Sequence, residues 1–318
     1  MLNPRRRLPS RALFLALLFL ISALVGVSIA TSTDVFTSAG QNTRPNSHTA
    51  VNRSNSTSGR VLFSGNWETG SISQWGGAQC ANYGDNEPAI GNVNVVTEPE
   101  PVAQGKYSAR FDLPANPKGS SCEVLRGRTE SLGSDEWYGQ EVYFPSNWQD
   151  PSIWGMAVGQ YNFSALGQGA LVGVGARGDH VNLVISTGLC QPHGPCPYTT
   201  GNDWPGQQGT LNTTLRVVPL GTKLAGTWQQ WIVHVHWAAD SSGHVDAWWR
   251  PRGRTSWTQT VNWGGYPTVQ WTSAQPPATN ARTYDKIGAY RGGASFPISI
   301  WQDGFCVATS FAAAQSCL

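Results

Sequence analysis

The sequence is poor in charge. Of its 318 residues, 21 are Lys or Arg and 19 are Asp or Glu, which together make 13% of the chain, against about 25% in an ordinary soluble domain. It contains 36 Gly and 20 Pro, a load that excludes a coiled coil, and 15 Trp, which excludes a disordered acidic chain. The length allows one large domain or two small ones.

The slight excess of basic residues comes from the N-terminal segment. Four arginines precede the first acidic residue, Asp34, and loss of this segment lowers the 21 basic side chains to 17, against 19 acidic ones. We therefore expect no nucleic-acid partner held by bulk charge. An anionic ligand must instead be bound by a few well-placed residues.

Residues 1–30 have the pattern of a secretory signal peptide. They combine a basic start, an apolar run from Ala12 to Val27, and the small-x-small sequence Ser28-Ile29-Ala30. An uncleaved membrane anchor is the alternative, because the apolar run is nearly long enough to span a bilayer. Either reading predicts an extracellular domain. Residues 31–60 are rich in Ser, Thr and Asn, which predicts a disordered linker ahead of one domain over 61–318.

The cysteines predict disulfide bonds. All six follow the linker, and an even number of cysteines in an exported chain is typical of paired ones. Fifteen pairings are open to them, although close spacing favours one loop from Cys190 to Cys196 and another from Cys306 to Cys317, leaving Cys80 with Cys122. A zinc site is the less favoured alternative, since no CxxC sequence occurs.

The body of the chain predicts an all-β fold. Short runs of alternating apolar and polar residues are separated by Gly, Pro, Asn and Asp, with no long apolar stripe of helical period. This pattern predicts a two-sheet antiparallel β-sandwich of the jelly-roll, concanavalin-like type. The expected strands include 107–113, 139–144, 171–175, 181–186, 227–237, 244–250, 284–291 and 298–305.

Strand alternation assigns side chains to faces. Lys286 and Tyr290 share one face of the strand 284–291, and His234 and His236 share the polar face of 227–237. Aromatic, amide and charged side chains on such faces are typical of a groove that stacks on sugar rings and hydrogen-bonds their hydroxyls. The alternative is that most of the tryptophans belong to the core, and that the two histidines bind a metal or have a structural role.

Several sequence blocks occur in an order that resembles a known family. The chain resembles the secreted polysaccharide lyases of the heparin-lyase-I-like and glucuronan-lyase type, a resemblance that implies a β-jelly roll. It covers nearly the whole domain, from about Val61 to Phe311. The blocks are NWETGSISQW at 66–75, QGKYSARFDL at 104–113, EWYGQEVYFPSNW at 136–148, GTWQQWIVHVHW at 226–237, DAWW at 246–249, YDKIGAYR at 284–291 and IWQDGF at 300–305.

The resemblance also implies site residues. The family's Lys-x-x-x-Tyr pair matches Lys286 and Tyr290, and its Arg-x-Glu sequence matches Arg128 and Glu130. A Gln-aromatic-His block, whose His is catalytic in the heparin-lyase group, falls on Gln160-Tyr161-Asn162. Asn therefore stands where those lyases carry His, which leaves the substrate and the activity open.

Cleavage of a uronic-acid glycan by β-elimination needs a base for the C5 proton, an acid for the O4 oxygen, and a group that neutralises the carboxylate. Tyr290 is the candidate base and acid, because a nearby cation such as Arg128 would lower its ordinary pKa of about 10. Lys286, Gln160 and Asn162 are the candidates that contact the carboxylate. We assign Asn162 the neutralising role.

Further candidates have weaker support. Glu130 either orients Arg128 or forms a surface ion pair with it. The remaining candidates for substrate contact are Arg291, His234, His236 and Tyr161. Two functions remain: a polysaccharide lyase, or a noncatalytic carbohydrate-binding jelly roll. Glycoside hydrolysis is disfavoured, because no strand carries the paired carboxylates that it requires.

The expected partner is a polysaccharide. Because the domain has so few cations, a weakly sulfated or unsulfated uronan fits better than a heavily sulfated one. Membrane association is expected only if the N-terminal segment stays uncleaved. No cofactor is expected, and although calcium occurs in some relatives, no cluster of oxygen ligands can be placed for it.

Overall fold

The computed structural model describes residues 59–82, 91–127, 130–151, 155–163, 172–190, 214–272 and 282–318. The chain divides into two units, Met1–Ser54 and Asn55–Leu318, and all the described residues belong to the second. The predicted signal peptide and most of the predicted linker thus lie outside the described residues. Among the described helices, none is long and apolar enough to cross a membrane.

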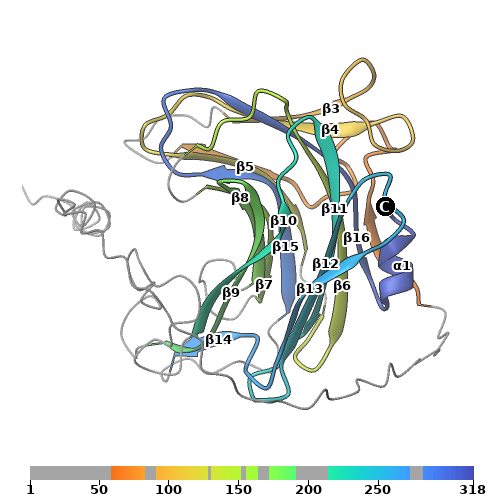
Figure 1. Ribbon diagram of the computed structural model, residues 1–318, viewed down its shortest axis with the longest axis vertical. Coiled ribbons are helices and arrows are strands. Elements are labelled where there is room, and N and C mark those ends of the chain that lie inside the picture. The colour runs from red at the N-terminus through yellow and green to blue at the C-terminus, as the bar shows by residue number, and fades with distance from the viewer. Residues whose placement is uncertain are drawn as a thin grey trace, which may run out of the picture. The chain divides into compact units, whose positions relative to one another are not determined.

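Two β-sheets make up this unit (Figure 1). Sheet A has eight strands in the order β13-β12-β11-β6-β16-β4-β3, with β1 pairing β16 as well. All its pairs are antiparallel. Its strands are β1 (Val61–Gly65), β3 (Asn92–Val96), β4 (Ser108–Leu113), β6 (Asp135–Phe144), β11 (Thr227–His236), β12 (His244–Pro251), β13 (Thr258–Gly264) and β16 (Ile298–Ala308).

Sheet B also has eight strands, in the order β10-β9-β8-β7-β15-β5-β2, and β14 pairs with β9 in parallel. The other pairs are antiparallel. Figure 1 shows this sheet curved, with its concave side turned away from sheet A. Its strands are β2 (Ala78–Asn82), β5 (Ser120–Arg126), β7 (Met156–Phe163), β8 (Val172–Arg177), β9 (His180–Cys190), β10 (Thr214–Thr222), β14 (Gln270–Thr272) and β15 (Thr283–Arg291).

The core lies between the two sheets, as the alternation of side chains requires. In β11, Trp231, Val233 and Val235 are fully buried in it, and in β15 so are Ile287 and Ala289. The architecture is an all-β sandwich of two antiparallel sheets, which confirms the fold predicted from the sequence. Each of the eight predicted strands overlaps a strand of the structure.

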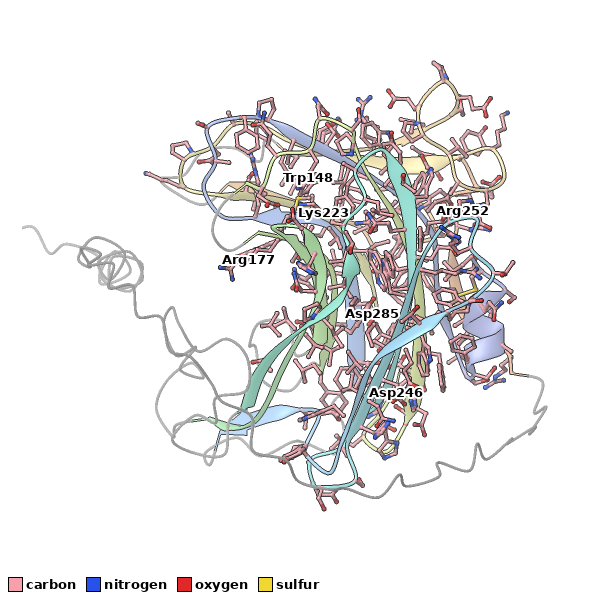
Figure 2. All side chains as sticks on the ribbon, viewed as in Figure 1. Trp148, Arg177, Lys223, Asp246, Arg252 and Asp285 are labelled. Carbon is pink, nitrogen blue, oxygen red and sulfur yellow. A yellow bond between two sulfur atoms is a disulfide. The ribbon has the colours of Figure 1, made fainter. Side chains whose placement is uncertain are left out.

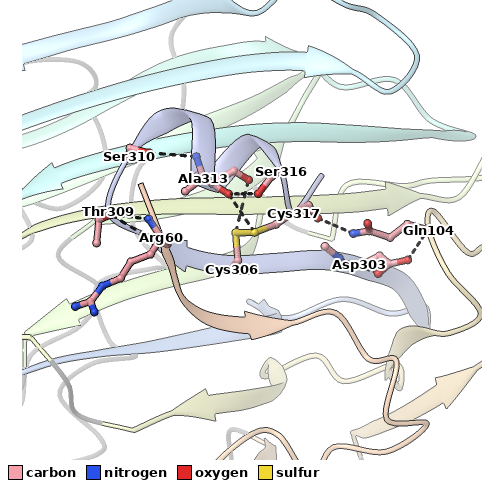
Figure 3. The surroundings of a disulfide bond; sticks show 11 residues. Arg60, Gln104, Asp303, Cys306, Thr309, Ser310, Ala313, Ser316 and Cys317 are labelled. Atoms are coloured by element: carbon pink, nitrogen blue, oxygen red, sulfur yellow. Dashed lines mark hydrogen bonds between the residues drawn. A yellow bond between two sulfur atoms is a disulfide. The ribbon is translucent and has the colours of Figure 1, made fainter. Parts of the chain in front are cut away.

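Two disulfide bonds lie within the described residues. Cys80 in β2 is bonded to Cys122 in β5, and Cys306 in β16 is bonded to Cys317 near the C-terminus. Cys306–Cys317 is a pair favoured by spacing, and Cys80–Cys122 is the pair that this spacing left over. The predicted Cys190–Cys196 bond stays a prediction, because Cys196 lies outside the described residues. The second bond holds the helix α1 (Phe311–Gln315) against the outer face of sheet A (Figure 3).

A buried charge cluster joins the sheets. The guanidinium of Arg126 in β5 lies 2.7 Å from a carboxylate oxygen of Asp285 in β15 and 3.3 Å from one of Glu136 in β6. Asp285 is labelled in Figure 2. Tyr138 and Trp237 donate hydrogen bonds to the other oxygen of Glu136. All five side chains are buried. Removing one partner of such a cluster leaves a buried charge uncompensated, at a cost of about 3–5 kcal/mol.

Candidate functional site

The outer face of sheet B carries the predicted Lys286 and Tyr290. Both project from β15 on the side away from the core, four residues and thus about 13 Å apart. Tyr290 is opposite Ser121 in β5 and Ala157 in β7, and 39% of it is exposed. Both neighbours are small, and Tyr290 is among the most exposed large side chains of the described residues.

Three side chains from three neighbouring strands of sheet B lie around Lys286. Its ammonium donates to the amide oxygen of Gln79 at 3.0 Å. The amide nitrogen of Gln160 in β7 donates to a carboxylate oxygen of Glu123 in β5. Lys286 is directly opposite Gln160 in register, and Gln79 directly opposite Glu123. We call Gln79, Glu123, Gln160 and Lys286 the polar quartet.

Gly288 explains how two members of the quartet meet. Gln160 and Glu123 belong to β7 and β5, which are separated by β15. The β15 residue opposite Glu123 is Gly288, which has no side chain to stand between them. Its φ of 150° also favours glycine, and a Cβ there would lie 2.3 Å from the carbonyl oxygen of Cys122. Any other residue would therefore disturb the strand beneath the quartet.

Glu123 is the titratable group of the quartet. Burial raises the pKa of its carboxyl to about 7, although the charge of Lys286 and the hydrogen bond from Gln160 both lower it. The side chain is only 5% exposed. Near neutral pH this carboxyl therefore exists in both forms, as an acceptor when ionised and a proton donor when neutral.

Asn162 lies beside the quartet on the same face of β7. It is only 2% exposed, and its amide nitrogen donates weakly to the carbonyl of Gln160 at 3.4 Å. Its amide oxygen has no hydrogen-bond partner within the described part of the chain. In this orientation the buried, unpartnered atom of Asn162 is an acceptor, which suits a hydroxyl better than the carboxylate predicted for it.

Of the predicted Arg-x-Glu pair, the structure describes only Glu130. Arg128 lies outside the described residues. Glu130 is half-buried, and its backbone carbonyl and N–H bond Thr283 at the start of β15, at 2.8 and 3.1 Å. Whether its carboxylate orients Arg128 thus stays a prediction.

Two predicted contact residues point into the core instead. Tyr161 alternates with Gln160 along β7, is fully buried, stacks on Tyr138 at 4.1 Å and donates to Gln140. Arg291 follows Tyr290, is 1% exposed and donates to the carbonyl of Pro114. The expectation that they contact substrate is therefore corrected, since adjacent strand residues face opposite sides.

The two predicted histidines lie on the other sheet. His234 and His236 project from the outer face of sheet A, on the far side of the core from Tyr290. His234 is held between Asp135 at 2.8 Å and Asp246 at 3.3 Å, and its ring stacks on Trp137. Asp246 marks this cluster in Figure 2. The two histidines therefore do not share a face with Tyr290, which corrects the expectation that they contact the same substrate.

Nothing in the described ranges is arranged as a metal centre. No group of three or more His, Cys, Asp or Glu side chains there is placed to hold an ion. The cluster around His234 is instead a set of hydrogen bonds and ion pairs. Burial lowers the pKa of His234, but its bonds to Asp135 and Asp246 outweigh burial, and the net pKa is raised.

Sequence reasoning missed Gln79 and Glu123. Neither β2 nor β5 was expected as a strand. In β5 the signal was present, because Cys122 and Val124 face the core while Glu123 alternates with them. Arg126 is on the same face as Cys122 and Val124, and a charged residue is not expected between two sheets. Its presence therefore hid the alternation that predicts a strand.

Jelly-roll sandwiches host many unrelated functions, so the fold alone does not identify the class of protein. The sequence model of the polysaccharide lyase family matches residues 67–306. The chain belongs to this polysaccharide lyase family. No curated protein sequence matches it.

Solved structures share the fold at low sequence identity. The chain is similar to an endo-β-1,4-glucuronan lyase from the fungus Trichoderma reesei, with a TM-score of 0.56 and 16% identity, over 80% of this chain and 98% of that one. It is also similar to a marine alginate lyase from Aplysia kurodai, with a TM-score of 0.45 and 10% identity, over 69% and 87%. The first likeness supports the fold.

Proposed function

We propose that this protein is an exported lyase that cleaves a uronic-acid-containing polysaccharide by β-elimination on the outer face of sheet B. The observation that carries the proposal is the convergence of the polar quartet with Tyr290 on one concave face. Family membership supports the lyase chemistry. The paired cysteines support export, because such bonds persist in oxidising compartments.

Tyr290 is the proposed base and acid. Its deprotonated phenol accepts the C5 proton of the uronate, the electrons of that C–H bond form the C4–C5 double bond, and the C4–O4 bond breaks. The proton on Tyr290 then passes to the departing O4 oxygen. One hydroxyl can serve both steps if the C5 proton and O4 lie on the same side of the sugar ring. Exposure of the phenol supports this role.

The quartet is proposed to bind the uronate carboxylate. Lys286 offers positive charge, and the amide of Gln160 offers a donor. Glu123 contributes when protonated, because a neutral carboxyl donates a hydrogen bond to a carboxylate and an ionised one repels it. Its raised pKa, about 7, favours the protonated form at acidic to neutral pH. The quartet thus fills the neutralising role first given to Asn162.

Asn162 is proposed to bind a substrate hydroxyl through its amide oxygen. A buried polar atom without a partner costs about 1–3 kcal/mol, which a ligand hydroxyl would recover. Lys286 is the only cation in the quartet. This supports a uronan with little or no sulfate, because a sulfated chain would need more cations.

The rival function is noncatalytic glycan binding on the same face. The test incubates the protein with glucuronan, alginate and heparin and follows the ultraviolet absorbance of the unsaturated uronate. New absorbance with one of the first two polymers is the expected result. Retention on an immobilised uronan without any new absorbance would instead establish the binding protein and overturn the lyase.

A further inference from the structure

Two glutamines of sheet A reach across the core to the strands that carry the site. Gln302 in β16 donates through its amide nitrogen to the carbonyl of Gly288 at 2.7 Å and to that of Val158 at 3.0 Å. Gln140 in β6 donates to the same Val158 carbonyl at 2.9 Å and to the amide oxygen of Gln302 at 2.9 Å. Both glutamines are fully buried.

Both carbonyls belong to irregular places in sheet B. The pairing of β15 with β7 shifts between Ile287 and Tyr290, and the pairing of β7 with β8 shifts between Ala157 and Gly159. Such a bulge disrupts the ladder of hydrogen bonds and re-aims the side chains beside it. Gly288 and Val158 lie inside these two shifts, and the glutamines bind their carbonyls from the opposite sheet.

The donor and acceptor roles in the hydrogen bonds from Gln140 through Gln302 to Gly288 are fixed by the residues that contact Gln140. The amide oxygen of Gln140 accepts from the ring nitrogen of Trp231 at 3.2 Å and from the hydroxyl of Tyr161 at 3.1 Å. Because an indole nitrogen only donates, the oxygen of Gln140 must face Trp231 and its nitrogen must face Gln302. The oxygen of Gln302 is then occupied, and its nitrogen is turned to Gly288.

We propose that Gln302, oriented by Gln140, is a positioning residue for the hydroxyl of Tyr290. Gly288 precedes Tyr290 by two residues, so fixing the Gly288 carbonyl fixes the direction of β15 where the phenol leaves it. Without this bond the strand gains a buried, unpaired carbonyl at a bulge, and it can relax towards regular pairing with β7. The proposal rests on the proposed function only in giving Tyr290 its chemical role.

The kinetic test is Gln302→Met, which keeps the volume and removes the donor. We expect kcat to fall about 100-fold, the effect of misplacing a reacting group by about 1 Å, while KM stays within a few-fold. The matched control is Gln229→Met, since Gln229 is also fully buried in sheet A but bonds only the Leu224 carbonyl among described residues. Wild-type kcat in Gln302→Met, or an equal fall in the control, would overturn the proposal.

A second readout does not depend on turnover. The protein is labelled with 3-fluorotyrosine, and the fluorine signal of Tyr290 is assigned by its loss in Tyr290→Phe. We expect Gln302→Met to shift or broaden this signal and Gln229→Met to leave it unchanged. An unchanged signal in Gln302→Met overturns positioning, whereas a wild type that cleaves no uronan overturns the function and leaves this test valid.

Should Gln302→Met fail to fold, Gln302→Glu replaces it. The neutral acid has a similar shape but one proton to donate, so it can bind only one of the two carbonyls of Gly288 and Val158 at a time. We expect a kcat below the wild type and a Tyr290 fluorine signal displaced from its wild-type position. Wild-type values in both measurements would overturn the proposal.

Discussion

Gln160 donates a hydrogen bond to the carboxylate of Glu123 across an intervening strand, over the bare backbone of Gly288. This contact joins β7 and β5 through their side chains alone, because β15 separates their backbones. It holds an amide donor beside an acid whose pKa is raised to about 7. A carboxylate bound there would meet a pair of groups whose relative position is already set.

Removal of one hydroxyl tests the role of Tyr290. We expect Tyr290→Phe to lower kcat by about 10²–10⁴-fold, the usual contribution of a general acid–base group, with uronan binding retained. The control is Tyr266→Phe, because Tyr266 is 38% exposed, close to the 39% of Tyr290, but follows β13 in sheet A. Steady-state absorbance assays and affinity electrophoresis measure the two quantities. A fully active Tyr290→Phe protein would contradict the assignment.

Ionisation of the Glu123 carboxyl should make uronan binding depend on pH. As the pH rises through about 7, this group becomes ionised and repels the bound carboxylate, so KM should increase. Glu123→Gln keeps a donor at every pH, and its KM should stay level from pH 6 to pH 8. KM is measured over that range for both proteins. Parallel curves for the two would exclude a contact between Glu123 and the substrate.

The same carboxyl predicts a pH-dependent stability. Because burial raises its pKa from 4.5 to about 7, the native state retains a proton that the unfolded chain has lost between these values, and stability falls as the pH rises. Glu123→Gln should therefore be more stabilising at pH 8 than at pH 5, by about 2–3 kcal/mol. Urea unfolding measures this difference, with Glu98→Gln on an exposed turn as the control.

His234 should matter for stability and not for activity. Its raised pKa means that the protonated form stabilises the fold at low pH, and that this contribution is lost as the pH rises above the native pKa. We expect His234→Asn to lose more stability at pH 5.5 than at pH 8, with lyase activity within about two-fold of the wild type. Thermal unfolding at the two pH values and the absorbance assay check both parts. A large loss of kcat would show instead that His234 takes part in the reaction.

The two described disulfides should differ in their effect on the site. The Cys80–Cys122 bond spans 42 residues and joins the neighbours of Gln79 and Glu123, whereas Cys306–Cys317 spans 11. Chain entropy assigns them about 4 and about 3 kcal/mol. Replacing the first pair by Ser should lower the melting temperature and raise KM, while replacing the second should affect stability alone. Equal KM values for both double variants would show that the Cys80–Cys122 bond does not affect substrate binding.

The alternation of apolar and polar residues correctly predicted on which face of a strand a side chain lies, but it did not predict which sheet the strand joins. It placed His234 and His236 together on the polar side of their strand, as found. It could not say which sheet that strand joins, because pairing partners are set by contacts between segments far apart in the sequence. The two histidines lie on the polar face of their strand, but that strand belongs to the other sheet from Tyr290. Their position on a polar face therefore did not show that they belong to the same site as Tyr290.

The strand β5 shows where local patterning fails. Its Arg126 is buried because Asp285 and Glu136 supply opposite charge from two other strands, and no local pattern reveals those partners. The quartet could be predicted only at Lys286 and Gln160, through the family resemblance. Gln79 and Glu123 required the register of β2 against β5.

The quartet alternates with core residues along each of its strands, and this makes the sheet suitable for redesign. Gln79, Gln160 and Lys286 can be exchanged for other side chains without opening a cavity in the core, since none of them packs there. Under the proposed function, libraries at these positions would change which acidic sugar is preferred while the scaffold stays folded. Gly288 is the fixed point of such libraries, because no side chain fits at its backbone position.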